Sequence, residues 1–114
     1  MITSVNETWS IDFYDGVEDD IIKMPPKIQA RILRLLDLME EHGANLGAPH
    51  TAPMGDGLFE IRAKAKEGIG RAFFCYMKDK HVHILLAFVK KTQKTPPKEL
   101  ELAKKRMKEV SQHE

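Results

Sequence analysis

The sequence has 114 residues and a single cysteine, Cys75, which limits the classes of protein it can belong to. One cysteine cannot form an intramolecular disulfide, so the disulfide-rich secreted class is excluded and a reducing compartment is favoured. The chain also lacks the paired Cys/His spacings that are typical of structural zinc sites.

Long apolar segments are missing as well. No run approaches the ~18 apolar residues that a membrane-spanning helix needs. The first ten residues, MITSVNETWS, lack the basic start and apolar stretch of a secretory signal peptide. We therefore expect a cytoplasmic protein with no membrane partner.

The composition that is present is that of an ordinary folded protein, with 42% hydrophobic and 31% charged residues. The length predicts a single domain over residues 1–114. The net charge of +1 conceals an uneven distribution: residues 1–56 hold 10 acidic and 4 basic side chains, whereas residues 57–114 hold 7 acidic and 14 basic ones. A basic second half gathered on one face would attract a polyanion.

Hydrophobic periodicity predicts the elements of the first half. Alternation over residues 8–15 predicts a half-buried strand, and a weaker pattern over 16–24 predicts a short helix that ends at two prolines. Apolar residues at helical spacing predict a helix between Pro25 and Gly43. The stretch 44–57, rich in glycine and proline, predicts a long surface loop.

Three strands and a helix are predicted in the second half. The segments LFEIRAKA, RAFFCYM and HVHILLAFV are separated by short turns, which predicts an antiparallel meander. PPKELELAKKRMKEV predicts a C-terminal helix. The fold class is therefore α/β of the α+β kind: an antiparallel sheet with an N-terminal strand and helices, a three-strand meander and a C-terminal helix.

Three segments taken together carry a resemblance to a known family. They are GLFEIR on one strand, GRAFF on the next, and FVKKTQKTP before the last helix. This combination resembles the RelE/ParE toxin superfamily, and more closely its phage-derived, HigB-like branch. The resemblance extends from about Trp9 to Val110.

The resemblance implies a small RelE-like fold and a toxin of a type II toxin–antitoxin system. Members of the RelE and HigB branches are ribosome-dependent endoribonucleases that cleave messenger RNA without a metal or other cofactor. The implied partners are the ribosome, its message and a cognate antitoxin, often a helix-turn-helix, HigA-like protein. Two alternatives stay open: a non-cleaving, ParE-like inhibitor of DNA gyrase, and an inactive member that only binds its antitoxin or represses transcription.

Metal-free RNA cleavage uses the 2′-hydroxyl of the RNA as its nucleophile, and it needs cations to stabilise charge on the phosphorus. Arg62 and Arg71 are the leading candidates, because they lie on consecutive strands joined by a short turn. In the family, basic residues at these strand positions contact the scissile phosphate. The alternative for Arg62 is a simple ion pair with Glu60. Neither arginine is expected to be needed for the core.

The reaction also needs a general acid and a general base. Lys91 and Lys94 are candidates, because neighbouring cations lower the pKa of a lysine. His50 is a further candidate, since histidine titrates near neutral pH, although an ordinary loop histidine is the alternative. The lysines expected to bind RNA are Lys64, Lys66, Lys90 and Lys98.

The identity of the acid and the base stays open at this point. RelE-type toxins often carry a tyrosine or another acid or base near the C-terminus, and residues 97–114 contain no tyrosine. No cluster of carboxylates accompanies the basic residues in the way that a two-metal site requires, so no metal is expected.

Overall fold

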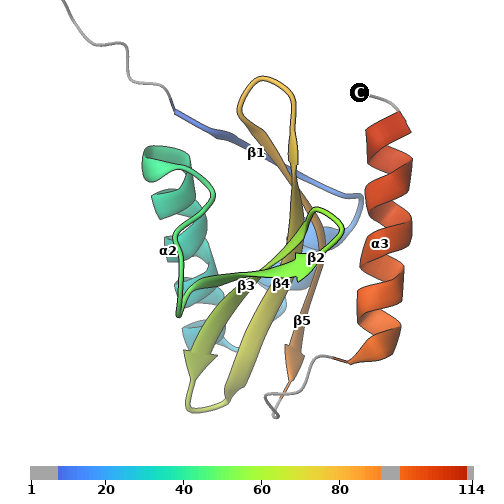
Figure 1. The fold of residues 1–114 in the computed structure, drawn as a ribbon. Coiled ribbons are helices and arrows are strands. Elements are labelled where there is room, and N and C mark those ends of the chain that lie inside the picture. Colours follow the sequence, from blue (N-terminus) through green and yellow to red (C-terminus); the bar gives the residue numbers. More distant parts are fainter. Residues whose placement is uncertain (1–7, 91–95, 113–114) are drawn as a thin grey trace, which may run out of the picture.

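Five strands form one sheet in the order β1-β5-β4-β3-β2 (Figure 1). The computed structural model describes residues 8–90 and 96–112. The strands are β1 (Ser10–Phe13), β2 (Thr51–Gly55), β3 (Leu58–Ala65), β4 (Gly68–Met77) and β5 (His81–Lys90). The helices are α1 (Val17–Ile22), α2 (Pro26–His42) and α3 (Pro97–Gln112).

The predicted meander is confirmed, since β3, β4 and β5 pair antiparallel in chain order. Two details differ from the prediction. β1 pairs with β5 in parallel, so the sheet is mixed. β2 lies within the predicted loop and pairs antiparallel with β3. Its sequence, TAPMG, carries no strand signal. Pro53 is tolerated there because β2 is an edge strand, with no described strand on its outer side.

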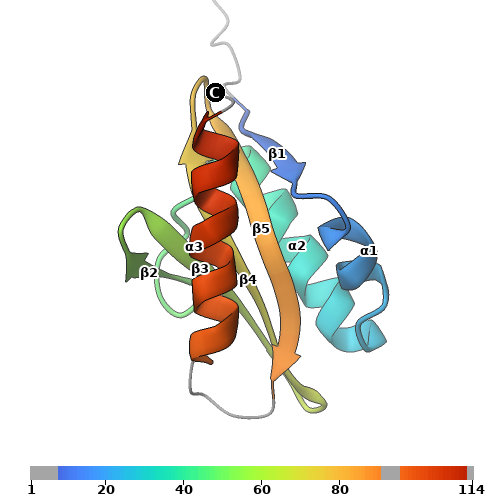
Figure 2. The ribbon, with the colours of Figure 1, turned by 90° about the vertical axis from the view of Figure 1, so that its right-hand side faces the viewer.

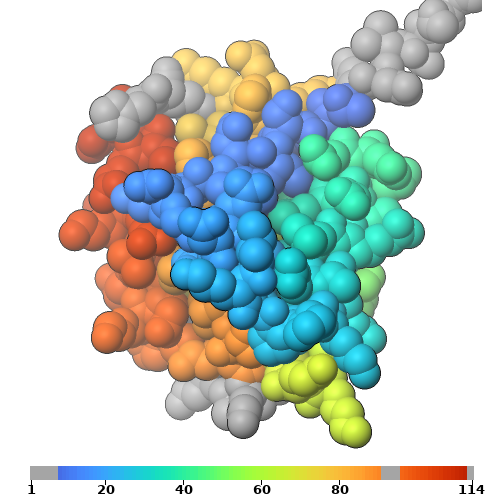
Figure 3. All heavy atoms as spheres, turned by 180° about the vertical axis from the view of Figure 1, so that it is seen from behind, coloured from blue at the N-terminus to red at the C-terminus, as the bar shows by residue number. Residues whose placement is uncertain are grey.

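The helices cover the sheet on both faces. α1 and α2 lie on one face and α3 lies on the other (Figure 2). Figure 3 shows α1 and α2, in blue and cyan, side by side over their face. None of the described helices is both long and apolar enough to cross a membrane.

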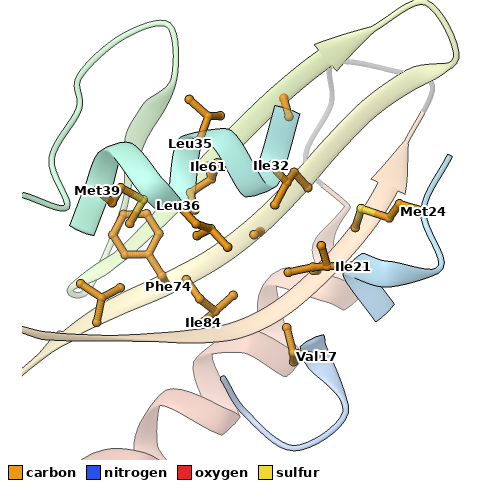
Figure 4. Close-up of a cluster of buried hydrophobic side chains, with 14 of the residues drawn as sticks. Val17, Ile21, Met24, Ile32, Leu35, Leu36, Met39, Ile61, Phe74 and Ile84 are labelled. Carbon is orange, nitrogen blue, oxygen red and sulfur yellow. The ribbon is translucent and has the colours of Figure 1, made fainter. Parts of the chain in front are cut away.

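The larger core lies between α2 and the sheet. Ile32, Leu36 and Met39 point from α2 towards Phe74 and Ile84 of the central strands (Figure 4). A smaller core lies under α3. The apolar stripes and alternations of the sequence predict ten core residues, and six of them are buried: Ile32, Leu35, Leu36, Ile61, Phe74 and Leu86. The other four are partly buried against the two cores: Ile11, Phe13, Leu100 and Met107.

Polar contacts hold α3 onto the sheet. Arg106 donates from Nη1 to the backbone oxygen of Leu85 at 2.9 Å. Leu85 falls at an irregularity in the pairing of β4 with β5, where a bulged residue leaves its backbone groups unpaired by the ladder. The Arg106 guanidinium also lies 4.4 Å from the centre of the Tyr14 ring, and Tyr14 donates its hydroxyl hydrogen to Glu109. These contacts tie α3 to both β5 and the segment after β1.

Gly70 sets the distance between α2 and the sheet. A β-carbon at this position would lie 2.4 Å from Ile28 Cγ2 and 2.9 Å from Ile32 Cδ1. We therefore expect Gly70→Ala to lower the free energy of unfolding by about 1–3 kcal/mol through overpacking, as measured by urea denaturation. In an Ile28→Ala background the same change should cost clearly less, because the first clash is gone. An equal cost in both backgrounds would show that α2 adjusts freely.

Candidate functional site

A groove opens between α2 and the end of β3. β2 pairs with β3 only as far as Ile61, and the next contact is the Arg62 amide, which donates to the His50 carbonyl at 2.8 Å. Beyond this point no described strand borders β3 on that side, and a hollow of about 410 Å³ lies there. It is lined by Arg31, Arg34, Leu35, Leu38, Pro49, His50, Arg62, Ala63, Lys64 and Ile69.

The lining of the groove combines apolar side chains with positive charge. Its apolar members come mainly from the inner side of α2 and from β3. Its basic members are Arg31, Arg34, His50, Arg62 and Lys64, and no carboxylate is among the lining residues of the described chain. Such a surface suits a phosphate-bearing ligand, because arginine and lysine make charge-assisted hydrogen bonds to phosphate oxygens.

Behind the groove lies a buried ion cluster. The Glu60 carboxylate accepts from Arg62 Nε at 2.7 Å on one oxygen and from Arg71 Nη1 at 3.1 Å on the other. The side chains of Glu60 and Arg71 have no exposed surface, whereas that of Arg62 is 39% exposed. A buried carboxylate needs partners of this kind, because desolvation penalises an unpaired charge heavily.

The predicted proximity of the two arginines is confirmed, because Arg62 and Arg71 are direct register partners on β3 and β4. The expectation that Arg71 is not needed for the core was wrong. Strand alternation places it on the same side as Phe73, under the layer of α3, and Glu60 supplies the buried counter-charge. The alternative reading for Arg62, an ion pair with Glu60, is also present in the structure, but this pair uses only Nε.

Three of the predicted site residues border the groove: His50, Arg62 and Lys64. The Arg62 side chain lies on the α3 face of the sheet, because Arg62 pairs with Arg71 and its Nε binds Glu60. His50 is exposed, and its backbone bond to Arg62 fixes the two residues side by side. The remaining predicted lysines are more scattered. Lys66 is exposed in the β3–β4 turn, Lys90 is partly buried opposite Ile69, and Lys98 is exposed in the first turn of α3. Lys91 and Lys94 lie outside the described residues.

Sequence reasoning missed Arg31 and Arg34. They fall in residues 1–56, the acidic half of the chain, and largely outside the apolar stripe of the predicted helix. A spacing of three residues places both on one side of the helix, next to the apolar stripe that contains Leu35. This spacing was the available signal, but only the fold shows that β3 passes beside that side of α2.

A second hollow lies under the C-terminal end of α3, where Tyr14, His83, Glu109 and Val110 meet. Burial lowers the pKa of His83, and the nearby Asp12 carboxylate opposes this in part. The hydrogen bond to Glu109 raises the pKa of Tyr14. Among the described residues no lysine or arginine lines this hollow, so it is the poorer candidate for an anionic ligand. Across the described part of the chain, no three His, Cys, Asp or Glu side chains are grouped so that they could hold a metal ion.

Comparison with known proteins now identifies the family. Residues 19–108 match the family described as Phage derived protein Gp49-like (DUF891). The chain belongs to this family. No match was found among curated protein sequences.

Solved structures show which fold this Gp49-like chain has. A mutant of the Escherichia coli toxin RelE in the free state gives a TM-score of 0.58 at 10% identity, covering 90% of this chain and 98% of RelE. The toxin–antitoxin complex RelBE2 from Mycobacterium tuberculosis gives 0.54 at 17% identity, covering 73% and 99%. An archaeal RelE–RelB complex from Pyrococcus horikoshii OT3 gives 0.52 at 19% identity, covering 72% and 94%.

These findings confirm the resemblance to the RelE/ParE superfamily and the predicted fold class. At such low identity the structures establish the fold and not the chemistry. The assignment to the HigB-like branch stays a prediction.

The burial of Arg71 predicts a large effect on stability. Arg71→Ala leaves Glu60 buried with one partner fewer, and breaking a buried pair in this way costs about 3–5 kcal/mol. Arg62→Ala should lower the free energy of unfolding by less than Arg71→Ala does, because water can reach the half-exposed end of that pair. Urea unfolding of both variants checks this order. Equal, small losses would contradict a core role for Arg71.

His83 predicts a dependence of stability on pH. Because its pKa is lower in the folded state, the unfolded chain binds a proton first as the pH falls. The stabilisation is complete above the ordinary histidine pKa of about 6.5 and is lost as the pH falls from there towards the folded value. His83→Gln should therefore lose less free energy of unfolding than the wild type between about pH 6.5 and 5. His42→Gln, whose side chain is 66% exposed, is the control and should behave like the wild type.

Proposed function

We propose that this protein is the toxin of a type II toxin–antitoxin system and that it cleaves messenger RNA on the ribosome without a metal. In this reaction the 2′-hydroxyl of the RNA attacks the adjacent phosphorus, and the 5′-oxygen of the next nucleotide leaves. The observation that carries the proposal is the groove of the RelE-like fold in which His50, Arg62 and Lys64 meet.

Arg62 is proposed to stabilise the charge that develops on the phosphorus. Arg62 Nε donates to Glu60, and the two terminal nitrogens of Arg62 make no hydrogen bond to the described residues. These nitrogens present a fork of donors that matches two phosphate oxygens. Arg71 has no exposed surface, so we do not propose that it touches the RNA directly.

The remaining groups are proposed to bind the RNA chain and move protons. His50 can accept or donate a proton at its ring and lies beside Arg62, which supports a role as general base or acid. Lys91 and Lys94 are the other proposed acid or base groups. Lys64 and the arginines of α2 would bind phosphates within the groove, and Lys66, Lys90 and Lys98 would bind them beyond it.

An antitoxin is the proposed protein partner. Two of the similar structures are complexes of a toxin with its antitoxin, which supports a partner of this class. We propose that the antitoxin inhibits by covering or distorting the basic groove, and that it is a helix-turn-helix, HigA-like protein. A complex in which Arg62 stays open and undistorted would count against this mode of inhibition.

Primer extension on a defined message with purified ribosomes tests the activity. Cleavage predicts new 3′ ends within the codon in the ribosomal A site, and only when ribosomes are present. Inhibition of DNA gyrase without cleavage would support the ParE-like alternative instead. Neither activity, together with tight binding of the antitoxin, would identify an inactive member of the family.

Arg62→Ala should reduce cleavage on the order of 10²–10³-fold, because a charge-assisted donor is lost from the transition state. Single-turnover rates at saturating ribosome measure this loss separately from binding. His50→Gln tests the acid or base role: loss of the rate together with a changed pH profile supports it, and an unchanged profile refutes it. Cleavage by folded Arg62→Ala at the wild-type rate would exclude this groove as the active site.

The arginines of α2 should contribute to binding and not to chemistry. For a short single-stranded RNA, the logarithm of the binding constant falls with the logarithm of salt concentration by about 0.7 per neutralised phosphate. Arg31→Ala and Arg34→Ala should each reduce this slope by about that amount. Lys105→Ala, an exposed change on α3 outside the groove, is the control and should leave it unchanged.

A further inference from the structure

Glu60 is fully buried, yet it binds a side chain that reaches the surface. One of its oxygens binds Arg71, which is equally buried, and the other binds Arg62, whose side chain is 39% exposed. The carboxylate therefore connects the buried Arg71 with the half-exposed side chain of Arg62.

We propose that Glu60 is a positioning residue, which fixes the Arg62 guanidinium through Nε so that its terminal nitrogens meet a phosphate at the half-exposed edge of β3. The identity of that phosphate, the scissile group of an RNA, rests on the proposed function. The positioning itself is a property of this chain and can be tested without cleavage.

The contact through Nε orients the Arg62 guanidinium and leaves its terminal nitrogens unoccupied by Glu60. A free arginine side chain samples many rotamers, and ordering it on binding costs conformational entropy. With Nε held at 2.7 Å by a buried acceptor, the plane of the guanidinium is set before the substrate arrives. The two outer nitrogens then remain available as a bidentate pair of donors.

Arg71 gives the cluster its charge. Glu60 and Arg62 alone would form a neutral pair, which would attract an anion only weakly. With Arg71 bound to the second carboxylate oxygen, the cluster carries two positive charges and one negative charge. Of these three residues, Arg62 is the one that an anion can approach from solvent. Arg71 therefore adds a buried positive charge close to Arg62.

Stability alone does not require this arrangement. Buried ion pairs replaced by apolar side chains of similar size are often neutral or more stable. A variant that removes both buried charges can therefore fold while it leaves Arg62 without its acceptor. Glu60→Leu/Arg71→Met is such a variant. Glu60→Gln/Arg71→Met is its matched control, since the glutamine oxygen still accepts from Arg62 Nε.

We expect the Leu/Met variant to reduce the single-turnover cleavage rate about tenfold or more, with little change in ribosome affinity. The Gln/Met control should recover part of this loss. Adding Arg62→Ala should slow the Leu/Met variant much less than it slows the wild type, because Arg62 is no longer held there. A folded Leu/Met variant that cleaves at the wild-type rate would overturn the proposal and leave Glu60 a purely structural role.

A second measurement does not depend on activity or on the folding of any variant. In the wild-type protein, NMR should find the Arg62 Nε–H exchanging with solvent much more slowly than that of Arg34, which is exposed on α2. Equal exchange at the two sites would refute positioning by Glu60. Slow exchange in a protein that cuts no RNA would refute the proposed function while leaving the positioning intact.

Discussion

The Glu60 carboxylate is the contact on which the position of Arg62 depends. It sits inside the sheet with no exposure to water, and two guanidinium groups compensate its charge. One of them, Arg71, belongs to the interior, and the other, Arg62, ends at the surface. A surface cation is thereby attached to a buried framework, which gives it a defined direction instead of the freedom of an ordinary exposed arginine.

The rest of the fold exposes that cation. β2 ends its pairing early, so the end of β3 faces α2 across open space and not across another strand. Gly70 allows α2 to approach the sheet closely, and Arg106 ties α3 to the other face at the bulge near Leu85. Both helices therefore cover the sheet while the edge beside His50 and Arg62 stays open.

Most of the fold follows from local patterns in the sequence, because alternation and helical spacing directly report which side chains are buried. The strand TAPMG could not be predicted in this way, since its pairing depends on the free edge of β3. The same limit applies to the site. The strand pattern of the sequence predicts that Arg62 and Arg71 are neighbours, but it does not predict which of the two is exposed to water. That depends on Glu60 and on the layer of α3. The contribution of Arg31 depends on how α2 crosses the sheet, and no local pattern encodes this.

The central claim is that the RNA supplies its own nucleophile at a site organised around Arg62. The most direct measurement uses purified ribosomes and a message with a single 2′-deoxynucleotide immediately 5′ of the mapped cut. Attack by the 2′-hydroxyl predicts that this one substitution abolishes cleavage at that bond, while an identical substitution a few nucleotides away has no effect. Cleavage of the deoxy-substituted bond at the normal rate would contradict the mechanism.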